Sequence, residues 1–295
     1  MKELPLQVSR RAHLSGLIKY RLLSWLLDQP SKLAFCAPGD IVGRAIMAFG
    51  TFEPEVIELI GFTARQFLRD PSETVFIDVG ANVGTHSVGL ASAFRRVLAF
   101  EANPATALVA KANALAAGAQ NVEVHPIGLS DDNRDGVLSM PNPHAFSWAS
   151  VTPTGSPGIG IKLQQGDQYL ANVLGNDERV GVIKIDVEGY EPEVLSGLRS
   201  TLITQKPIVA FEALDETAKK RSIELLKSLG YCTFLGVSTR TRPLLQRIWG
   251  LMKVRKVYLE EISVGTGYSC VIALPHHAGD PERKATSAGR VWSAD

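Results

Sequence analysis

The sequence predicts an α/β domain built on a mostly parallel β-sheet with helices on both faces. Short apolar, β-branched runs alternate with helical patterns, the connections between them are short, and we detect no internal repeat. Strands and helices that alternate in this way form right-handed crossovers, which place successive strands parallel to one another. The chain has 295 residues, 45% of them hydrophobic, and can therefore bury a substantial core.

The expected strands are short apolar runs, and most are followed by a helix-forming stretch. The strand runs are 74–80, 97–102, 122–130, 180–189, 207–214, 231–237 and 267–275. The last of them is a candidate for an antiparallel strand. The helical stretches are 15–27, 53–68, 84–94, 104–117, 192–205 and 215–229.

The start of this regular alternation sets the expected domain boundaries. We expect an N-terminal helical extension over 1–72, a main domain over 73–275 and a polar, flexible tail over 276–295. Residues 131–170 are rich in Gly, Pro, Ser and Asn, which predicts a hairpin and a mobile loop inserted into the main domain. We expect no second domain with its own core.

Composition argues against several classes of protein. The formal charge of +1, from 31 basic and 30 acidic residues, disfavours nucleic acid as a partner. Cys36, Cys232 and Cys270 lie far apart, which predicts buried thiols and neither a disulfide framework nor a zinc site. The first residues lack the pattern of a secretion signal, and no apolar run is long enough for a membrane span. We therefore expect a cytoplasmic protein.

The segment FIDVGANVG, 76–84, ends a strand in an acid and then breaks into glycines. Ligands of open parallel sheets bind at the carboxyl ends of the strands, and the first strand-to-helix turn usually holds them. Gly80 permits a tight turn close to a ligand, and Gly84 lets the next helix begin beside the sheet. We predict that Gly80, Ala81, Asn82 and Gly84 bind a cofactor.

The acid Asp78 distinguishes between three cofactor classes. A P-loop needs a GxxxxGK[ST] motif, whose lysine is absent, and a dinucleotide site needs GxGxxG with a pyrophosphate that Asp78 would repel. S-adenosylmethionine has no phosphate, and its sulfonium and ammonium groups are attracted to an acid. Asp78 therefore favours S-adenosylmethionine.

Acids also follow the second and third predicted strands. Glu101, in the segment AFEANP with Asn103, is placed to accept hydrogen bonds from a ribose diol. Ser130 and Asp131 are placed to recognise adenine. Each acid alone is explained more simply as a helix cap or a solvated turn. Together with the glycine turn, they favour an S-adenosylmethionine site.

The segments FIDVGANVGTHS, AFEANP, GLSD, IKIDVEGYEPEVLSGL and PIVAFEA resemble the FkbM-type class I methyltransferases. The resemblance covers about 40–214, including the upstream FEPEV. It implies a Rossmann-like fold with a seven-stranded sheet, and O-methylation of a hydroxyl on a sugar, glycolipid or polyketide-like natural product. Three features depart from the family pattern: His86, Ala102 and the GDQYL segment around Asp167, which weakens any role for that acid.

Methyl transfer to a hydroxyl calls for alignment of the two reactants and for a base. Strand alternation is expected to place Lys184, Asp186 and Glu188 on one face. Asp186 or Glu188 can take the proton, and Lys184 can keep its acid partner ionised or orient the substrate. Glu212 and His144 are further candidate bases. In the competing structural interpretation, Lys184 pairs with Glu188, and Glu188 caps the following helix.

Further residues are candidates for contacts with the cofactor, the acceptor or a metal ion. The resemblance implies that Glu53 closes over the cofactor, although an acid before a proline is also an ordinary helix cap. Phe146 and Trp148 can stack on a sugar or an apolar acceptor or simply pack on the sheet. Asp186, Glu188 and Glu212 can hold a divalent ion, but we favour a reaction without metal.

Two rival functions stay open at this point. A nicotinamide-dependent oxidoreductase is compatible with the fold, but GxGxxG and a YxxxK pattern are missing. A non-catalytic binding protein on the same fold would be expected to lose Asp78, Glu101 and Asp186, which are present. The expected partner is a small-molecule, glycan or lipid hydroxyl acceptor, and a homodimer is compatible with the sequence.

Overall fold

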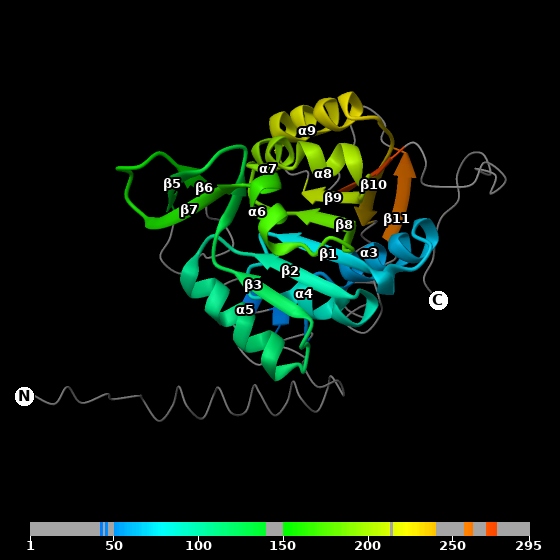
Figure 1. Cartoon of the computed structure of the whole chain (residues 1–295), viewed down its shortest axis with the longest axis horizontal. Coiled ribbons are helices and arrows are strands. Elements are labelled where there is room, and N and C mark those ends of the chain that lie inside the picture. The colour runs from blue at the N-terminus through cyan, green and yellow to red at the C-terminus, as the bar shows by residue number, and fades with distance from the viewer. Residues whose placement is uncertain are drawn as a thin grey trace, which may run out of the picture.

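The computed structural model describes residues 42–43, 45–46, 50–139, 150–212, 215–239, 257–261 and 270–275. These residues form one large sheet with helices on both faces and one smaller sheet beside it (Figure 1). The predicted helix 15–27, the tail 276–295, and Cys36, His144, Phe146 and Trp148 lie outside the described residues. The division of the chain at 72 and 275 therefore stays a prediction.

The large sheet has eight strands in the order β11-β10-β12-β9-β8-β1-β2-β3. The strands are β1 (Thr74–Val79), β2 (Arg96–Phe100), β3 (Val122–His125), β8 (Arg179–Ile185), β9 (Ile208–Glu212), β10 (Tyr231–Thr239), β11 (Val257–Glu261) and β12 (Cys270–Pro275). The five strands β3, β2, β1, β8 and β9 are parallel, and β12 is antiparallel to both β9 and β10. The predicted Rossmann-like class is confirmed. β11 adds an eighth strand at the edge, beyond the seven expected.

Helices cover both faces of the large sheet, as Figure 1 shows. On one side lie α3 (Pro54–Phe67), α4 (Thr85–Leu90) and α5 (Pro104–Ala116), and on the other α6 (Gly166–Val173), α7 (Glu191–Gly197), α8 (Arg199–Thr204) and α9 (Glu216–Ser228). The predicted helix 192–205 is in fact two helices, because the backbone leaves helical geometry at Leu198. Asp167, outside the cavity described below, accepts hydrogen bonds from the backbone N–H groups of Ser200 and Thr201 and so stabilises the start of α8.

The core consists of two apolar layers, one on each face of the large sheet. Phe76 of β1 packs with Ile60 of α3 and Leu90 of α4. Its neighbour Ile77 points to the other face and belongs to the cluster that contains Leu195 of α7. Because both faces are covered, the strands are apolar at nearly every position, which explains their continuous hydrophobic runs.

The smaller sheet comes from the segment in which a hairpin was predicted. Its strands are β4 (Gly128–Ser130), β5 (Arg134–Ser139), β6 (Ser150–Thr152) and β7 (Ile159–Gln165), in the order β4-β7-β5-β6. The single strand predicted over 122–130 is wrong, because β3 ends at His125 and β4 joins the smaller sheet. Pro126, which has no N–H to donate, stands at the break.

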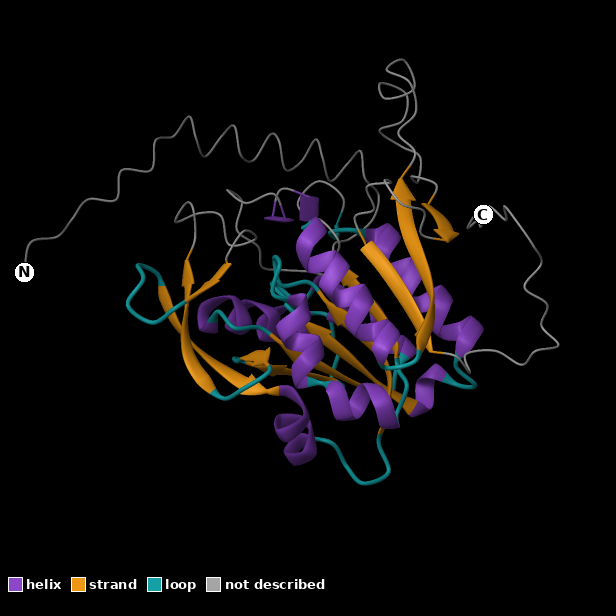
Figure 2. Cartoon of the chain, turned by 90° about the horizontal axis from the view of Figure 1, so that it is seen from above, coloured by secondary structure: helices purple, strands orange, loops and turns teal. Residues whose placement is uncertain are grey.

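The smaller sheet lies beyond the carboxyl ends of the parallel strands. In Figure 1 it stands at the end toward which the arrows of β8 and β9 point, and Figure 2 shows it set to one side of the large sheet. This is the edge at which parallel sheets bind ligands.

Two further sequence expectations can be compared with the structure. Cys270 is buried as predicted, but Cys232 is exposed, because alternate residues of β10 point away from the core. Within the described residues, we find no helix that is long and apolar enough to cross a membrane.

Candidate active site

A cavity of about 290 Å³ opens at the carboxyl edge of the large sheet. Its walls come from the ends of β1, β2, β8 and β9, from the starts of α3 and α4, and from the smaller sheet. The lining residues are Val42, Phe52, Glu53, Val79, Gly80, Ala81, Asn82, Thr85, His86, Phe100, Glu101, Ala102, Asn103, Gly128, Leu129, Leu138, Val151, Leu163, Lys184, Asp186, Val187, Glu188, Tyr190 and Glu212. Most of the predicted site residues are therefore brought together.

The glycine turn forms the floor of the cavity. Gly80 has a φ of 76°, and a Cβ at this position would lie 1.9 Å from the backbone oxygen of Asp186. The backbone N–H groups of Gly80 and Ala81 both donate to the carbonyl of Phe100, at 2.9 and 3.0 Å, which ties the turn to β2. Only glycine fits this conformation and this close approach. The turn has the shape predicted from its sequence.

Glu101 lies directly after β2 and is held from two sides. Its carboxylate accepts hydrogen bonds from the backbone N–H of Asn82 at 2.9 Å and from that of Asn103 at 2.8 Å. Burial raises the pKa of Glu101, although these two hydrogen bonds act in the opposite direction. The oxygens keep lone pairs free, so this carboxylate can still accept from a ligand's hydroxyl groups. The side chain of Asn103 instead caps α5 by accepting from Ala105.

Lys184 of β8 connects two acids. Its Nζ lies 3.3 Å from Oδ1 of Asp78, its register partner on β1, and 3.2 Å from Oδ2 of Asp186. Burial alone would lower the pKa of Lys184, but attraction to Asp186, Asp78 and Glu53 outweighs it and raises the pKa. Lys184 therefore carries its positive charge at neutral pH.

Asp78 lies behind the cavity wall. It is fully buried, it does not line the cavity, and its second oxygen accepts a hydrogen bond of 2.6 Å from Ser87 Oγ. The visible contacts of Asp78 are thus with Lys184 and Ser87. Its direct contact with a cofactor stays a prediction.

The alternation expected beyond Lys184 holds for one residue and then fails. Asp186 contacts Lys184, but β8 has already ended at Ile185, and Glu188 lies in a turn with a φ of 52°. The alternation fails there because it requires extended backbone. Glu188 still lines the cavity, together with Asp186.

The competing structural interpretation of Glu188 is wrong. In the described part of the chain, the ion-pair partners of Lys184 are Asp78 and Asp186. The turn before α7 is braced by Glu191, which accepts from the backbone N–H groups of Val187 and Gly189 at 3.2 and 3.1 Å.

Three more carboxyl groups surround Asp186, and all have raised pKa values. Burial is the largest cause in each case, and repulsion by Asp186 is the next. The pKa rises to about 7 for Glu53, to about 7 for Glu188 and to about 9 for Glu212. This end of the cavity therefore binds protons tightly and would attract a positively charged ligand.

Glu53 does not act as the helix cap that its position suggests. It stands at the N-cap of α3 with a φ of 50°, yet its side chain makes no capping hydrogen bond. Its Oε2 lies instead 3.7 Å from Nε2 of His86. A left-handed conformation is costly for a glutamate, which indicates that the surrounding structure holds it there for another reason.

His86 is the lining residue that the sequence analysis undervalued. Only 4% of its surface is exposed, and its Nε2 has no hydrogen-bond partner. Burial lowers its pKa to about 3, so the ring is neutral. The only sequence signal was that histidine is unusual at this position among the proteins this chain resembles.

Backbone strain gathers at the same cavity. Among the described residues, four that are not glycine have positive φ, namely Glu53, Asn82, Glu188 and Lys206. The first three line the cavity. Such residues concentrate at functional sites, because the fold tolerates their cost where a side chain must be aimed.

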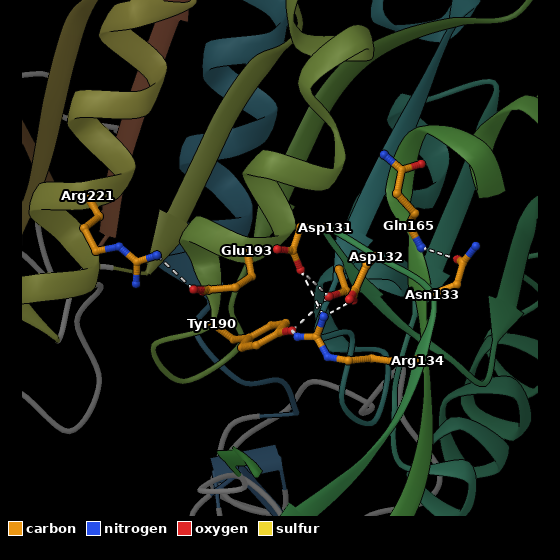
Figure 3. Close-up of polar contacts among 9 residues, drawn as sticks. Asp131, Asp132, Asn133, Arg134, Gln165, Tyr190, Glu193 and Arg221 are labelled. Carbon is orange, nitrogen blue, oxygen red and sulfur yellow. Dashed lines mark hydrogen bonds and ion pairs between the residues drawn. The ribbon is translucent and has the colours of Figure 1, made fainter. Parts of the chain in front are cut away.

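Ser130 and Asp131 are not brought into the cavity lining. Ser130 Oγ lies 2.9 Å from Asp131 and 2.8 Å from the hydroxyl of Tyr190. Arg134 contacts Asp131, Asp132 and Tyr190, as Figure 3 shows. Ser130 is the last residue of β4 and Asp131 follows it, so neither stands at the end of β3, which explains the difference from the prediction. A direct role in adenine recognition stays a prediction.

The smaller sheet supplies an apolar wall that the sequence analysis did not anticipate. Leu138, Val151 and Leu163 line the cavity beside Leu129 and Phe100, close to Glu101. No group of three or more His, Cys, Asp or Glu side chains in the described residues is arranged to hold a metal ion.

A parallel sheet with a glycine turn after one central strand and acids after its neighbours defines a Rossmann-like domain, a type that binds its ligands at this edge of the sheet. Residues 78–233, which are 156 of the 295, match the family model described as a methyltransferase FkbM domain. The chain belongs to the FkbM methyltransferase family, as its sequence motifs predicted.

Two curated relatives and one solved structure show the range of similar proteins. The hexuronic acid methyltransferase AglP of Haloferax volcanii is 33% identical over 151 residues, which cover 51% of this chain and 58% of AglP. The AMB antimetabolite synthetase AmbE of Pseudomonas aeruginosa is 27% identical over 235 residues, which cover 65% of this chain and 10% of AmbE. The structure of methyltransferase FkbM from Methylobacillus flagellatus KT has a TM-score of 0.42 and 16% identity, with 89% of this chain and 60% of that chain covered.

Proposed function

We propose that this protein is an S-adenosylmethionine-dependent O-methyltransferase that acts on a hydroxyl of a sugar, glycolipid or polyketide-like natural product. The observation that carries the proposal is the cavity, in which a glycine turn and acids from successive strands meet. Family membership supports methyl transfer, and the name of the relative AglP supports a sugar acceptor.

The lining residues fit S-adenosylmethionine chemically. Gly80 lets the turn pack against the backbone of Asp186, which a Cβ would meet, and Asn82 offers a buried Oδ1 that has no hydrogen-bond partner. We assign the ribose hydroxyls to Glu101 and the adenine to the apolar wall around Leu129 and Leu163. Asn82 Oδ1 is suited to accept from the ammonium of the cofactor.

When bound, S-adenosylmethionine supplies a methyl group activated by a positively charged sulfur. Glu53 and Glu188, whose pKa values of about 7 leave them partly ionised at neutral pH, stabilise that charge, since the one Lys or Arg lining the cavity in the described structure, Lys184, is already paired with Asp78 and Asp186. The cavity walls align the acceptor with the methyl group, which can contribute on the order of 7–11 kcal/mol.

We assign the role of general base to Asp186. Lys184 holds Oδ2 of Asp186 at 3.2 Å and thereby orients the other oxygen for the acceptor's proton. Glu212, with a pKa of about 9, is protonated at neutral pH and is better suited to donate a hydrogen bond to the acceptor. Glu188, with a pKa of about 7, is the second candidate base.

The variant Asp186→Asn tests the base. We expect unchanged affinity for S-adenosylmethionine in calorimetric titration, but a fall of about 10²–10⁴ in turnover, measured as S-adenosylhomocysteine formed with a panel of glycosides and lipids. The exposed residue Asp135 provides a control, and Asp135→Asn should leave both quantities unchanged. Undiminished turnover in Asp186→Asn would refute the assignment.

The cofactor itself is tested by the same titration with S-adenosylmethionine and with NAD. Binding of S-adenosylmethionine is expected. Binding of NAD without S-adenosylmethionine would replace this proposal with the oxidoreductase interpretation.

A further inference from the structure

The position of the acceptor follows from the order of the strands and rests on the proposed function. Neighbouring strands lie about 4.8 Å apart, so Glu101 after β2 and Glu212 at the end of β9 stand three strand spacings apart, roughly 14 Å. If the nucleoside lies at Glu101, the methyl group points along the edge toward β8 and β9. The cavity end formed by Glu53, His86, Asp186, Glu188 and Glu212, here called the acceptor end, then receives the acceptor.

The acceptor end is rich in carboxyl groups and poor in available cations. Its four acids come from separate places: the start of α3, the end of β8, the turn after it and β9. In the described part of the chain, the one lysine or arginine in the lining is Lys184, which already lies between Asp78 and Asp186. An acceptor carboxylate or phosphate would find no free cation among these residues.

Within the described residues, Arg134 contacts the lining residue Tyr190, but its guanidinium is already engaged. Its guanidinium contacts the hydroxyl of Tyr190, and it also forms ion pairs with Asp131 and Asp132 (Figure 3). The two acids offset its charge. Arg134 therefore does not make the acceptor end attractive to anions.

The polar groups at the acceptor end lack the partners that a hydroxyl group provides. His86 Nε2 is buried without a hydrogen bond, and Glu53 Oε2 lies 3.7 Å from it, which is too far for a direct bond. One hydroxyl oxygen placed about 2.8 Å from both atoms can donate to Glu53 and accept from His86. Glu53 lines the cavity, and its side chain makes no capping hydrogen bond to the helix that follows it.

We propose that the acceptor end binds an uncharged polyhydroxyl compound, a neutral sugar or its glycoside, and rejects the corresponding uronic acid. Hydroxyl groups satisfy Glu53, His86 and Glu212 without adding charge. A carboxylate on the acceptor would face the ion-paired Asp186 and the partly ionised Glu53 and Glu188, and juxtaposing like charges in a partly buried site is strongly unfavourable.

The test uses matched pairs of methyl glycosides and methyl glycosiduronates in the gluco, galacto and manno series. Binding of each compound to protein saturated with S-adenosylhomocysteine is measured by saturation-transfer NMR and calorimetry. We expect at least one neutral glycoside to bind about tenfold or more tightly than its acid partner. Equal or tighter binding of the acids, or binding of no neutral glycoside, would overturn the proposal.

Charge-neutral variants locate the source of the discrimination. Glu53→Gln and Glu188→Gln together keep the side-chain size and, at pH 8 where both acids are mostly ionised, should reduce the preference for the neutral member by about tenfold. Glu58 is exposed on the same helix as Glu53 and does not line the cavity, so Glu58→Gln should leave the preference unchanged. An unchanged preference in the double variant would contradict the proposed mechanism.

Titration with S-adenosylmethionine separates this inference from the function on which it rests. If the cofactor does not bind, the proposed function fails. If the cofactor binds and the uronates are preferred, only the inference about the acceptor fails.

Discussion

The end of the cavity around Glu101, here called the nucleoside end after the ligand proposed for it, differs from the acceptor end in which groups present the polar atoms. Near Glu101, the ligand faces the backbone of one short turn, 80–84, and a carboxylate that this turn and the start of α5 hold in place. Near Glu212, the ligand faces side chains that come from four segments spread along the chain. The first end is a local structure, and the second exists only when the sheet is assembled.

The two ends also differ in how well their polar groups are satisfied without ligand. Both oxygens of Glu101 accept hydrogen bonds from the backbone. At the acceptor end, carboxyl groups have raised pKa values and His86 Nε2 has no partner. Unpaired polar groups and left-handed residues cost stability, and proteins commonly accept that cost where a ligand will compensate it. The acceptor end therefore holds more of these costs, and at the other end Asn82 also has a left-handed backbone and an unpaired Oδ1.

The largest expected effect comes from adding a single carbon at the nucleoside end. In Gly80→Ala, the Cβ would meet the backbone oxygen of Asp186 at 1.9 Å, with φ at 76°. We expect the free energy of unfolding to fall by about 3 kcal/mol, or the turn to distort, and the affinity for the cofactor to fall about 100-fold. Calorimetry with S-adenosylmethionine measures the affinity, and urea unfolding measures the stability.

Gly160→Ala is the matched control for this variant. An added Cβ at Gly160 has open space around it, and we expect little change in either quantity. If Gly80→Ala binds the cofactor as tightly as the parent protein, the backbone turn 80–84 does not form the cofactor site.

An effect of comparable size, on stability and not on cofactor binding, concerns the ion-paired lysine between the two ends. Lys184→Met leaves Asp78 buried without its cation, and we expect a loss of about 3–5 kcal/mol in the free energy of unfolding. Adding Asp78→Asn should restore part of that loss, since the unpaired charge is removed. Urea unfolding at neutral pH measures both variants. A loss below about 1 kcal/mol would show that the buried Asp78 does not depend on the charge of Lys184 for its stability.

The smallest predicted effect tests whether ionised acids at the acceptor end favour a positively charged ligand. Glu53 and Glu188 have pKa values of about 7, so both are mostly protonated at pH 6 and mostly ionised at pH 8. Ionisation favours a sulfonium ligand over the neutral thioether. The affinity of S-adenosylmethionine relative to S-adenosylhomocysteine should therefore rise about tenfold between these pH values.

This ratio removes the effects of pH that both ligands share, such as those on the common ammonium group. Substituting both acids, as Glu53→Gln and Glu188→Gln, should flatten the dependence. An affinity ratio that falls as the pH rises would contradict the prediction, because ionised carboxylates should favour the sulfonium ligand.

Much of the fold was predictable because its signals are local. The strands at 74–79 and 96–100 and the helix at 104–116 agree closely with the predicted runs. The break at Pro126 was missed because the apolar pattern continues through it from β3 into β4. That continuation belongs to a different sheet, and only long-range pairing with β7 decides this.

The candidate site was predictable to a similar extent. Glu101 and the glycine turn line the cavity as expected, because their positions follow from neighbouring residues in one segment, and their contacts with a cofactor stay a prediction. Glu53 was open to a capping interpretation, and His86 seemed a tolerated departure, because nothing near them in the sequence shows what they face. A role for Glu53 and His86 can be inferred only from the cavity that they line.

The sequence by itself determined the alternating α/β order, the glycine turn and the acids at the strand ends, since these depend on residues close together in the chain. Only the tertiary structure decided that Lys184 joins Asp78 to Asp186 and that Glu53, Glu188 and Glu212 surround the second of these acids. The physical reason is that electrostatic coupling and burial act through space. Their strength is set when β1, β8 and β9 align and exclude water, and not by spacing along the chain.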